Sequence, residues 1–372
     1  MDGQIADRTS NAESLPTRGV AGIGPDDRVV VVLGAGASIG EMKAAKSGAV
    51  PPADRDFLDV ASKHCRRRYS EVCKLFDEVW EDAPPYKLVS PQMRMEQLFA
   101  SCYLKVRQTD GRSEAGRAAR ELYDAIIILM RETLVETTDM ADPPHHTRLL
   151  RTLWDAQPGA LSVVALNYDV LADRALLSLN DSGALEWGHR YGYGFWPRGT
   201  PAVAASPSVT LLKLHGSVNW YIELPNRRRH TAYDTRAQIY IPQPCYRPGR
   251  PAWKNRQNTR GHSDTPVFPL LVPPVFEKST QISGTIAKLW GKAERALSTA
   301  TLVIFWGYSL PVTDYHSEIL FAQTARRAKY NLIVINPDRG ALAHVTDVCG
   351  HAWTRWFFGV EDFFEFADRG WR

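Results

Sequence analysis

The chain has 372 residues, of which 44% are hydrophobic and 23% charged. This composition excludes a disordered protein, a collagen-like fibre and a disulfide mini-protein. A chain of this length buries about 75% of the surface exposed by its unfolded form, so its core needs no metal or disulfide. The formal charge of +4, from 45 Lys+Arg against 41 Asp+Glu, is too small to indicate a nucleic-acid-binding protein by itself.

The number and spacing of the cysteines and the hydrophobic pattern indicate the cellular compartment of the protein. The five cysteines form no C-x-x-C pair and their number is odd, which argues against both a disulfide framework and a structural zinc site. The start of the chain has no signal-peptide pattern, and no segment approaches the ~18 apolar residues that a membrane span needs. We therefore expect a cytoplasmic protein without metal and without a membrane contact.

The N-terminal region predicts a tail followed by a strand and a turn. Residues 1–27 are polar and without periodicity, so we expect a disordered tail. Val29–Leu33 is an unbroken β-branched run, typical of a parallel strand covered on both faces. Gly34-Ala35-Gly36-Ala37-Ser38 follows it, a small-residue turn that lets a pyrophosphate approach a helix N-terminus. Ile39 stands where the dinucleotide-binding pattern has its third glycine. The alternative that these glycines only form a tight turn between strand and helix therefore stays open.

The rest of the chain alternates between helical and strand patterns. Helical periodicity over about 57–154 predicts an inserted block of roughly four helices. Strand patterns stand at 161–166, 209–214, 301–306 and 331–335, and helical patterns at 282–297 and 314–328. This alternation predicts an α/β protein with a Rossmann-like doubly wound parallel sheet and an inserted helical subdomain.

An Arg- and Pro-rich stretch over about 225–265 is predicted to leave the sheet as a long excursion. A solvated segment is the simplest interpretation, and a contact with nucleic acid or a partner protein is the alternative.

Polar residues stand where the predicted strands end. Asn167-Tyr168-Asp169 and His215 follow two of them, and Gly307-Tyr308-Ser309 and Asn336-Pro337-Asp338 follow two others. The carboxyl ends of parallel strands share the edge at which open α/β sheets bind ligands. Structural roles stay open here: an N-cap for Asp169, a satisfied structural histidine for His215, and turns for the last two segments.

Taken in order, these motifs resemble the sirtuin superfamily, and more closely the bacterial sirtuin-like NAD hydrolases of antiphage defence. Gly34–Ser38 looks like the nucleotide loop, Asn167-Tyr168-Asp169 like the Asn-x-Asp element and Leu214-His215-Gly216 like the catalytic histidine segment. Gly307-Tyr308-Ser309 and Ile335-Asn336-Pro337-Asp338 resemble the elements on the adenosine side. Zinc-ribbon cysteines of the deacylases are missing, since residues 217–306 contain only Cys245.

The resemblance implies one NAD-binding catalytic domain over 28–372, with NAD+ as substrate and no metal. Its implied catalytic residues are Asn167, His215 and Asp169. Its implied NAD+-binding residues are Gly34, Ala35, Gly36, Ala37, Ser38, Gly307, Tyr308, Ser309, Asn336 and Asp338.

The activity expected from this set is an NAD+ glycohydrolase that releases nicotinamide and ADP-ribose, as a triggered antiphage effector that depletes NAD+. Nicotinamide leaves as a neutral molecule, so one base suffices, and we expect His215 to act as that base on water or on a ribose hydroxyl. Asn167 is expected to position the nicotinamide ribose or the attacking water, and Asp169 to orient the ribose or support the developing oxocarbenium charge. Control is expected from homo-oligomerisation or a separately encoded partner protein. The alternatives are an NAD- or ADP-ribose-sensing module and an NAD-dependent deacylase or ADP-ribosyltransferase.

Overall fold

The computed structural model of the chain describes residues 27–80, 93–159, 161–197, 207–223, 239–241, 267–273, 284–311, 313–350 and 353–369. The expected tail, Asp27 apart, lies outside the described residues. The same holds for the Arg- and Pro-rich excursion apart from residues 239–241.

A six-stranded parallel sheet forms the centre of the fold. Its strands stand in the order β3-β2-β1-β7-β8-β9, and every neighbouring pair is parallel. The chain builds outward from β1 on one side and then returns to build outward on the other, which confirms the predicted doubly wound sheet. The bounds are β1 Val29–Leu33, β2 Leu161–Ala165, β3 Thr210–Lys213, β7 Leu302–Trp306, β8 Asn331–Ile335 and β9 Thr354–Phe357.

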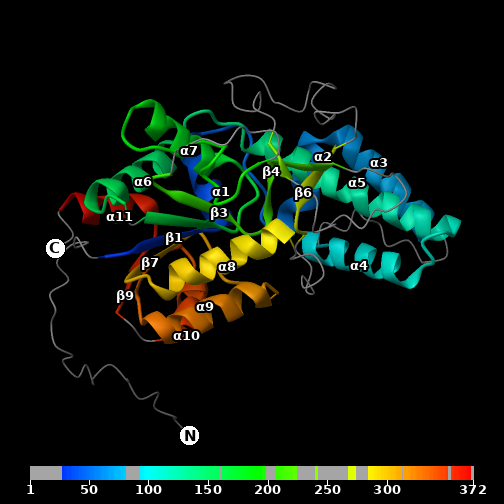
Figure 1. The fold of residues 1–372 in the computed structure, drawn as a ribbon. Coiled ribbons are helices and arrows are strands. Elements are labelled where there is room, and N and C mark those ends of the chain that lie inside the picture. Colours follow the sequence, from blue (N-terminus) through cyan, green and yellow to red (C-terminus); the bar gives the residue numbers. More distant parts are fainter. Residues whose placement is uncertain are drawn as a thin grey trace, which may run out of the picture.

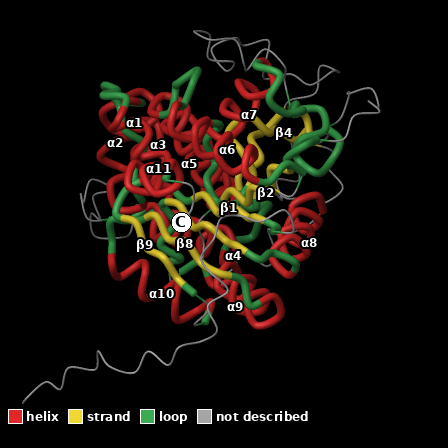
Figure 2. Tube along the Cα trace, turned by 90° about the vertical axis from the view of Figure 1, so that its left-hand side faces the viewer, coloured by secondary structure: helices red, strands yellow, loops and turns green. Residues whose placement is uncertain are grey.

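Helices cover both faces of this sheet (Figures 1 and 2). One layer contains α1 (Ala35–Ala44), α6 (Pro144–Ala156), α7 (Leu171–Asp181) and α11 (Val360–Asp368). The opposite layer contains α8 (Gly284–Ser298), α9 (Tyr315–Ala328) and α10 (Arg339–Cys349). Residues Val29–Leu33 of β1 are at most 2% exposed, because both layers cover them. The β-branched side chains of its four valines suit such a doubly covered strand.

The helical block differs from the sequence-based expectation at its end. It contains the short turn Asp54–Asp56 and the helices α2 (Phe57–His64), α3 (Arg66–Val79), α4 (Met95–Gln108) and α5 (Glu114–Thr137), with α5 packed against the other three. The predicted block also included α6, which instead packs on α1, α7 and α11 over the main sheet. Periodicity shows that a helix has an apolar face but not which element covers that face.

A second, antiparallel sheet lies between the main sheet and the helical block (Figure 1). Its order is β5-β4-β6, with β4 at Gly216–Glu223, β5 at Ile239–Tyr240 and β6 at Val267–Leu271. Arg131 of α5 donates from Nε to the carbonyl of Val218 at 2.9 Å and so connects the helical block to this sheet. Among the described helices, none has the length and hydrophobicity needed to cross a membrane.

Candidate functional site

The five strand ends singled out in the sequence lie along one edge of the main sheet. The last residues of neighbouring strands are in register: Leu33 pairs with Ala165 on one side and with Trp306 on the other. Trp306 in turn pairs with Ile335, and Ala165 with Lys213. The order of the sheet reverses between β1 and β7, and ligands of open α/β sheets bind outside the strand ends at such a reversal.

The glycines after β1 and β7 pack backbone against backbone. Gly36 N donates to Gly307 O at 2.8 Å, and Gly34 N donates to Trp306 O at 3.0 Å. A Cβ on Gly307, which has φ +64°, would lie 2.0 Å from Ala37 N, so a side chain has no room there. The glycines at these positions are therefore explained by the close packing of the two backbones, in addition to any contact with phosphate.

The same loop presents the N-terminus of α1 at the sheet edge. Ala35 and Gly36 are exposed, whereas Ala37 and Ser38 are buried. Ala37 N is bonded to Gly34 O at 2.9 Å, so this N–H and those of Gly34 and Gly36 already have protein acceptors. What the loop offers an anion is chiefly exposed backbone at the positive end of the helix dipole.

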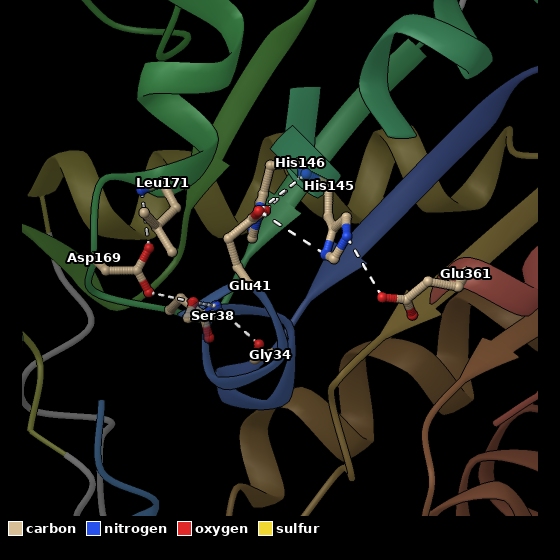
Figure 3. Close-up of polar contacts among 9 residues, drawn as sticks. Gly34, Ser38, Glu41, His145, His146, Asp169, Leu171 and Glu361 are labelled. Carbon is tan, nitrogen blue, oxygen red and sulfur yellow. Dashed lines mark hydrogen bonds and ion pairs between the residues drawn. The ribbon is translucent and has the colours of Figure 1, made fainter. Parts of the chain in front are cut away.

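Asn167, Ser38 and Asp169 form a buried cluster of polar groups. Asn167 Nδ2 donates to Gly34 O at 2.8 Å and to Ser38 Oγ at 3.0 Å. Ser38 Oγ donates to Asp169 Oδ2 at 2.6 Å, while Asp169 Oδ1 accepts from Leu171 N at 3.0 Å (Figure 3). A carbonyl can only accept, so the amide nitrogen must face Gly34 and the Asn167 Oδ1 atom is the acceptor left for a ligand.

Both oxygens of Asp169 are thus bonded within the protein, and one of them supports the start of α7. Lys213, 1% exposed, donates from Nζ to the backbone carbonyl of Asp169 and to Asp173 Oδ2. These contacts hold the loop that carries Asn167 in a single position.

His215 lies in the link between the two sheets. It follows β3 and directly precedes Gly216, the first residue of β4, whose φ is +81°. A Cβ on Gly216 would lie 2.2 Å from Leu270 O, so only glycine permits this turn against β6. The chain therefore passes from the main sheet to the antiparallel sheet at His215.

The imidazole of His215 is 5% exposed and has a defined orientation. Nδ1 lies 3.2 Å from Leu166 O, the carbonyl next to Asn167 in the sequence. Since that oxygen can only accept, Nδ1 carries the hydrogen and Nε2 is the basic nitrogen of the neutral ring. Nε2 lies 3.7 Å from Asp314 Oδ2. His215 and Asn167 therefore sit side by side on neighbouring strand ends.

Two phenols, Tyr308 buried and Tyr168 half-buried, complete this part of the site. Tyr308 donates to Asp314 Oδ2 at 2.8 Å, and Tyr168 donates to Val272 O at 2.7 Å. Burial, and next the charge of Asp314, raise the pKa of both phenols well above the usual value. Both therefore stay protonated at neutral pH. Sequence reasoning missed Asp314, because it belongs to no recognised motif and approaches the imidazole only through the turn that leads into α9.

The end of β8 behaves differently. Asn336 Oδ1 accepts from Asp338 N at 3.0 Å, and Asp338 Oδ1 accepts from Gly340 N at 2.8 Å, which caps α10. Asp338 and Ser309 are exposed. The two polar side chains of this segment thus serve turn and cap, the structural alternative left open above, and their exposed neighbourhood remains available to a ligand.

A buried carboxylate that the sequence analysis missed lies one turn beyond Ser38 on α1. Glu41, 0% exposed, accepts from His145 N at 3.0 Å and from His146 N at 2.8 Å, and His146 Nδ1 lies 2.6 Å from its Oε2 (Figure 3). Burial alone raises the pKa of Glu41, but these partners outweigh it and hold the pKa below its usual value. Glu41 therefore joins α1 to the N-terminus of α6.

Within the part of the chain that the structure describes, no three His, Cys, Asp or Glu side chains are grouped so as to hold a metal ion. The four described cysteines, Cys65, Cys73, Cys102 and Cys349, are free.

Comparison with known proteins gives structural matches alone. No family model matches the sequence, and no curated protein matches it. Solved structures of Sir2 enzymes are similar to the chain. One of them comes from a study of the mechanism and regulation of Sir2 enzymes and is 16% identical in sequence. The match covers 92% of this chain and 93% of that chain, with a TM-score of 0.45.

Two other similar structures are complexes. One contains Sir2 with the inhibitor EX-527, 2'-O-acetyl-ADP-ribose and a deacetylated p53 peptide, with 16% identity, coverage of 92% and 94% and a TM-score of 0.42. The other contains Sir2 with a p53 peptide and NAD+, with 15% identity, coverage of 92% and 91% and a TM-score of 0.44.

Proposed function

We propose that this chain is an NAD+ glycohydrolase that cleaves the bond between nicotinamide and ribose. The observation that carries the proposal is the position of His215: its Nδ1 hydrogen is held by Leu166 O beside Asn167, so Nε2 is left as the base. The ordered set of sirtuin-like motifs supports NAD+ as the substrate, because all the strand ends that carry them share one edge of the sheet.

The dinucleotide would lie across the point where the strand order reverses. Its pyrophosphate would face the exposed backbone of Ala35 and Gly36 at the positive end of α1. The adenosine side would lie toward Gly307-Tyr308-Ser309 and Asn336-Pro337-Asp338, and the nicotinamide ribose toward Asn167 and His215. This direction places the scissile bond beside the imidazole.

Hydrolysis then needs one base and one positioned acceptor. Asn167 Oδ1 accepts a hydrogen bond from the attacking water or from a ribose hydroxyl. The water oxygen bonds to the anomeric carbon, its proton passes to His215 Nε2, and the electron pair of the broken C–N bond leaves with neutral nicotinamide. A general base of this kind contributes about 10²–10⁴ in rate. Asp169 acts as a positioning residue through Ser38 and the start of α7.

The biological role proposed with this activity is that of a triggered antiphage effector that depletes NAD+. An enzyme that consumes a central cofactor must be held inactive in the resting cell. We therefore include activation by homo-oligomerisation or by a separately encoded partner protein in the proposal.

The test is NAD+ turnover by the purified chain over a range of protein concentrations, with nicotinamide and ADP-ribose quantified by chromatography. His215→Ala and Asn167→Ala should each lower turnover by about 10²-fold or more. His64→Ala, at an exposed position in α2, and Asn331→Ala, at the exposed start of β8, are matched controls that should retain turnover.

Three results would overturn the proposal. Full turnover by His215→Ala would show that His215 is not the general base. Tight binding of NAD+ in calorimetry with the dinucleotide recovered intact would favour a sensing module. Release of acyl groups from labelled peptides, without hydrolysis of free NAD+, would favour a deacylase.

A further inference from the structure

We propose that Asp314 is the carboxylate partner of His215: it stabilises the imidazolium that forms when Nε2 takes a proton, and it holds the attacking water together with Nε2. This inference rests on the proposed glycohydrolase function and adds a residue to its site. Asp314 stands just before α9, on the opposite side of β1 in the strand order from the strand that leads to His215.

The first observation is that Asp314 occupies a helix N-cap position without capping. Asp at an N-cap normally accepts a hydrogen bond from a backbone N–H of the first turn. The Asp314 side chain makes no such bond to α9. Its carboxylate is instead directed at Tyr308 Oη, at 2.8 Å, and at His215 Nε2, at 3.7 Å. A buried carboxylate, 5% exposed, is thus diverted from the usual local role toward the imidazole.

The second observation is that the position of Asp314 is fixed from several sides. Asp314 N donates to Pro311 O at 2.8 Å, and Asp314 O accepts from Glu318 N at 3.1 Å. Tyr308 donates its hydroxyl hydrogen to Oδ2. The carboxylate is therefore held facing Nε2 before any ligand binds, which is the preorganisation that electrostatic stabilisation requires.

The geometry assigns the direction of proton transfer. Because the Nδ1 hydrogen of His215 is committed to Leu166 O, the proton taken from water must arrive at Nε2, on the side that faces Asp314. The new N–H then lies beside an ionised carboxylate, and two opposite charges at this distance in a buried site attract strongly. Asp314 keeps its charge throughout, as the carboxylate of a His–Asp pair does.

The separation of 3.7 Å also suits a shared water. It exceeds a hydrogen bond, so the two groups do not satisfy each other directly. A water that donates one hydrogen to Nε2 and the other to Oδ2 turns its lone pairs away from both and toward the anomeric carbon. Because both hydrogens of this water are then used, Asn167 Oδ1 accepts from the ribose hydroxyl. When its oxygen bonds to that carbon, one hydrogen moves to Nε2 and the other stays on oxygen, bonded to Asp314.

Asp314 is the charged side chain that faces Nε2, and aromatic rings pack beside the same imidazole. The rings of Tyr168 and Trp290 lie 5.8 Å and 6.2 Å from the imidazole, between centroids. Indole is neutral, and burial keeps the phenols of Tyr168 and Tyr308 protonated. Removing the charge of Asp314 should therefore alter the titration of His215 directly.

The decisive experiment is Asp314→Asn, with Glu318→Gln as the control because it removes a negative charge from the first turn of the same helix. We expect kcat/KM for NAD+ at neutral pH to fall at least tenfold in Asp314→Asn, mainly through kcat. The acid limb of its pH profile should move to lower pH by about one unit. Glu318→Gln should retain both the rate and the profile.

A second readout does not depend on turnover. In NMR titrations of ring-labelled histidine, the His215 midpoint should fall in Asp314→Asn and rise in Tyr308→Phe, where the carboxylate is no longer shared with a phenol. An unchanged midpoint in either folded variant would overturn the inference. If the wild-type chain fails to hydrolyse NAD+, the proposed function fails, and the titration still decides whether Asp314 is the partner of His215.

Discussion

The two halves of the sheet edge carry similar sequence patterns but use them differently. Beyond β2 and β3, Asn167, Asp169 and His215 bond to groups far away in the sequence, such as Gly34, Ser38 and Leu166. Beyond β8, Asn336 and Asp338 bond to their own neighbours and shape a turn and a helix start. Side chains with long-range contacts at a strand end therefore indicate a candidate functional site, whereas side chains with only local contacts stabilise a turn or a helix start.

The two N-cap aspartates show the same contrast. Asp338 caps α10, but Asp314 leaves α9 uncapped and faces an imidazole. Their residue type and helix position are alike, so only the contacts distinguish a cap from a candidate catalytic partner. The comparison can be tested by removing long-range and local contacts in turn.

Loss of the Glu41 charge should have the largest effect on stability. In Glu41→Gln, the amide NH2 would meet the donor N–H groups of His145 or His146, and each lost hydrogen bond to a charged group costs about 1.5–3 kcal/mol. The pKa of Glu41 is lowered in the folded chain, so its contribution is present above about pH 4.5 and is lost as the pH falls through the folded-state pKa.

Urea unfolding at pH 7 and near pH 4 measures this difference, which should shrink at the lower pH. Glu294→Gln is the control, because the pair between Glu294 and Arg327 is largely exposed and should contribute about 0–1 kcal/mol. Equal losses in the two variants would contradict the importance of the long-range contact.

The second largest expected effect is the difference in kcat between variants of two asparagines that follow strands. Asn167→Ala removes an acceptor beside the proposed base and frees Gly34 O, so we expect about a 10²-fold lower kcat for NAD+ hydrolysis. Asn336→Ala removes a local turn contact and should cost about 1 kcal/mol of stability with less than a tenfold change in kcat. Steady-state kinetics and urea unfolding of both variants test this. A larger kcat loss in Asn336→Ala would break the comparison.

The smallest expected effect concerns the two aspartates that precede helices. Asp338→Ala should lower the free energy of unfolding by about 1 kcal/mol through the lost cap, and should leave kcat nearly unchanged. Asp314→Asn should show the reverse, with a kinetic loss and no capping loss, since Asp314 makes no capping bond. Circular dichroism melting beside turnover separates the two, and a capping-sized loss for both would remove the distinction.

Much of the fold was predictable because its signals are local. The strands at Val29–Leu33, Leu161–Ala165 and Asn331–Ile335 are short apolar runs that end in turn residues, and the parallel sheet follows from their alternation with helices. The strand β4 escaped prediction because its first residues, Gly216 and Ser217, resemble a loop that follows a strand end, so the sequence does not show that a strand of a second sheet begins there.

The sequence alone determined the sheet, the edge at which its polar residues gather and the identity of Asn167 and His215 as candidates, because periodicity and strand ends are written in neighbouring residues. Only the tertiary structure decided that α6 belongs to the sheet layer, that the glycines after β1 and β7 pack on each other, and that Glu41 and Asp314 face histidines. These contacts join residues that are separated along the chain, and a side chain's partner depends on how distant elements pack rather than on its neighbours in sequence.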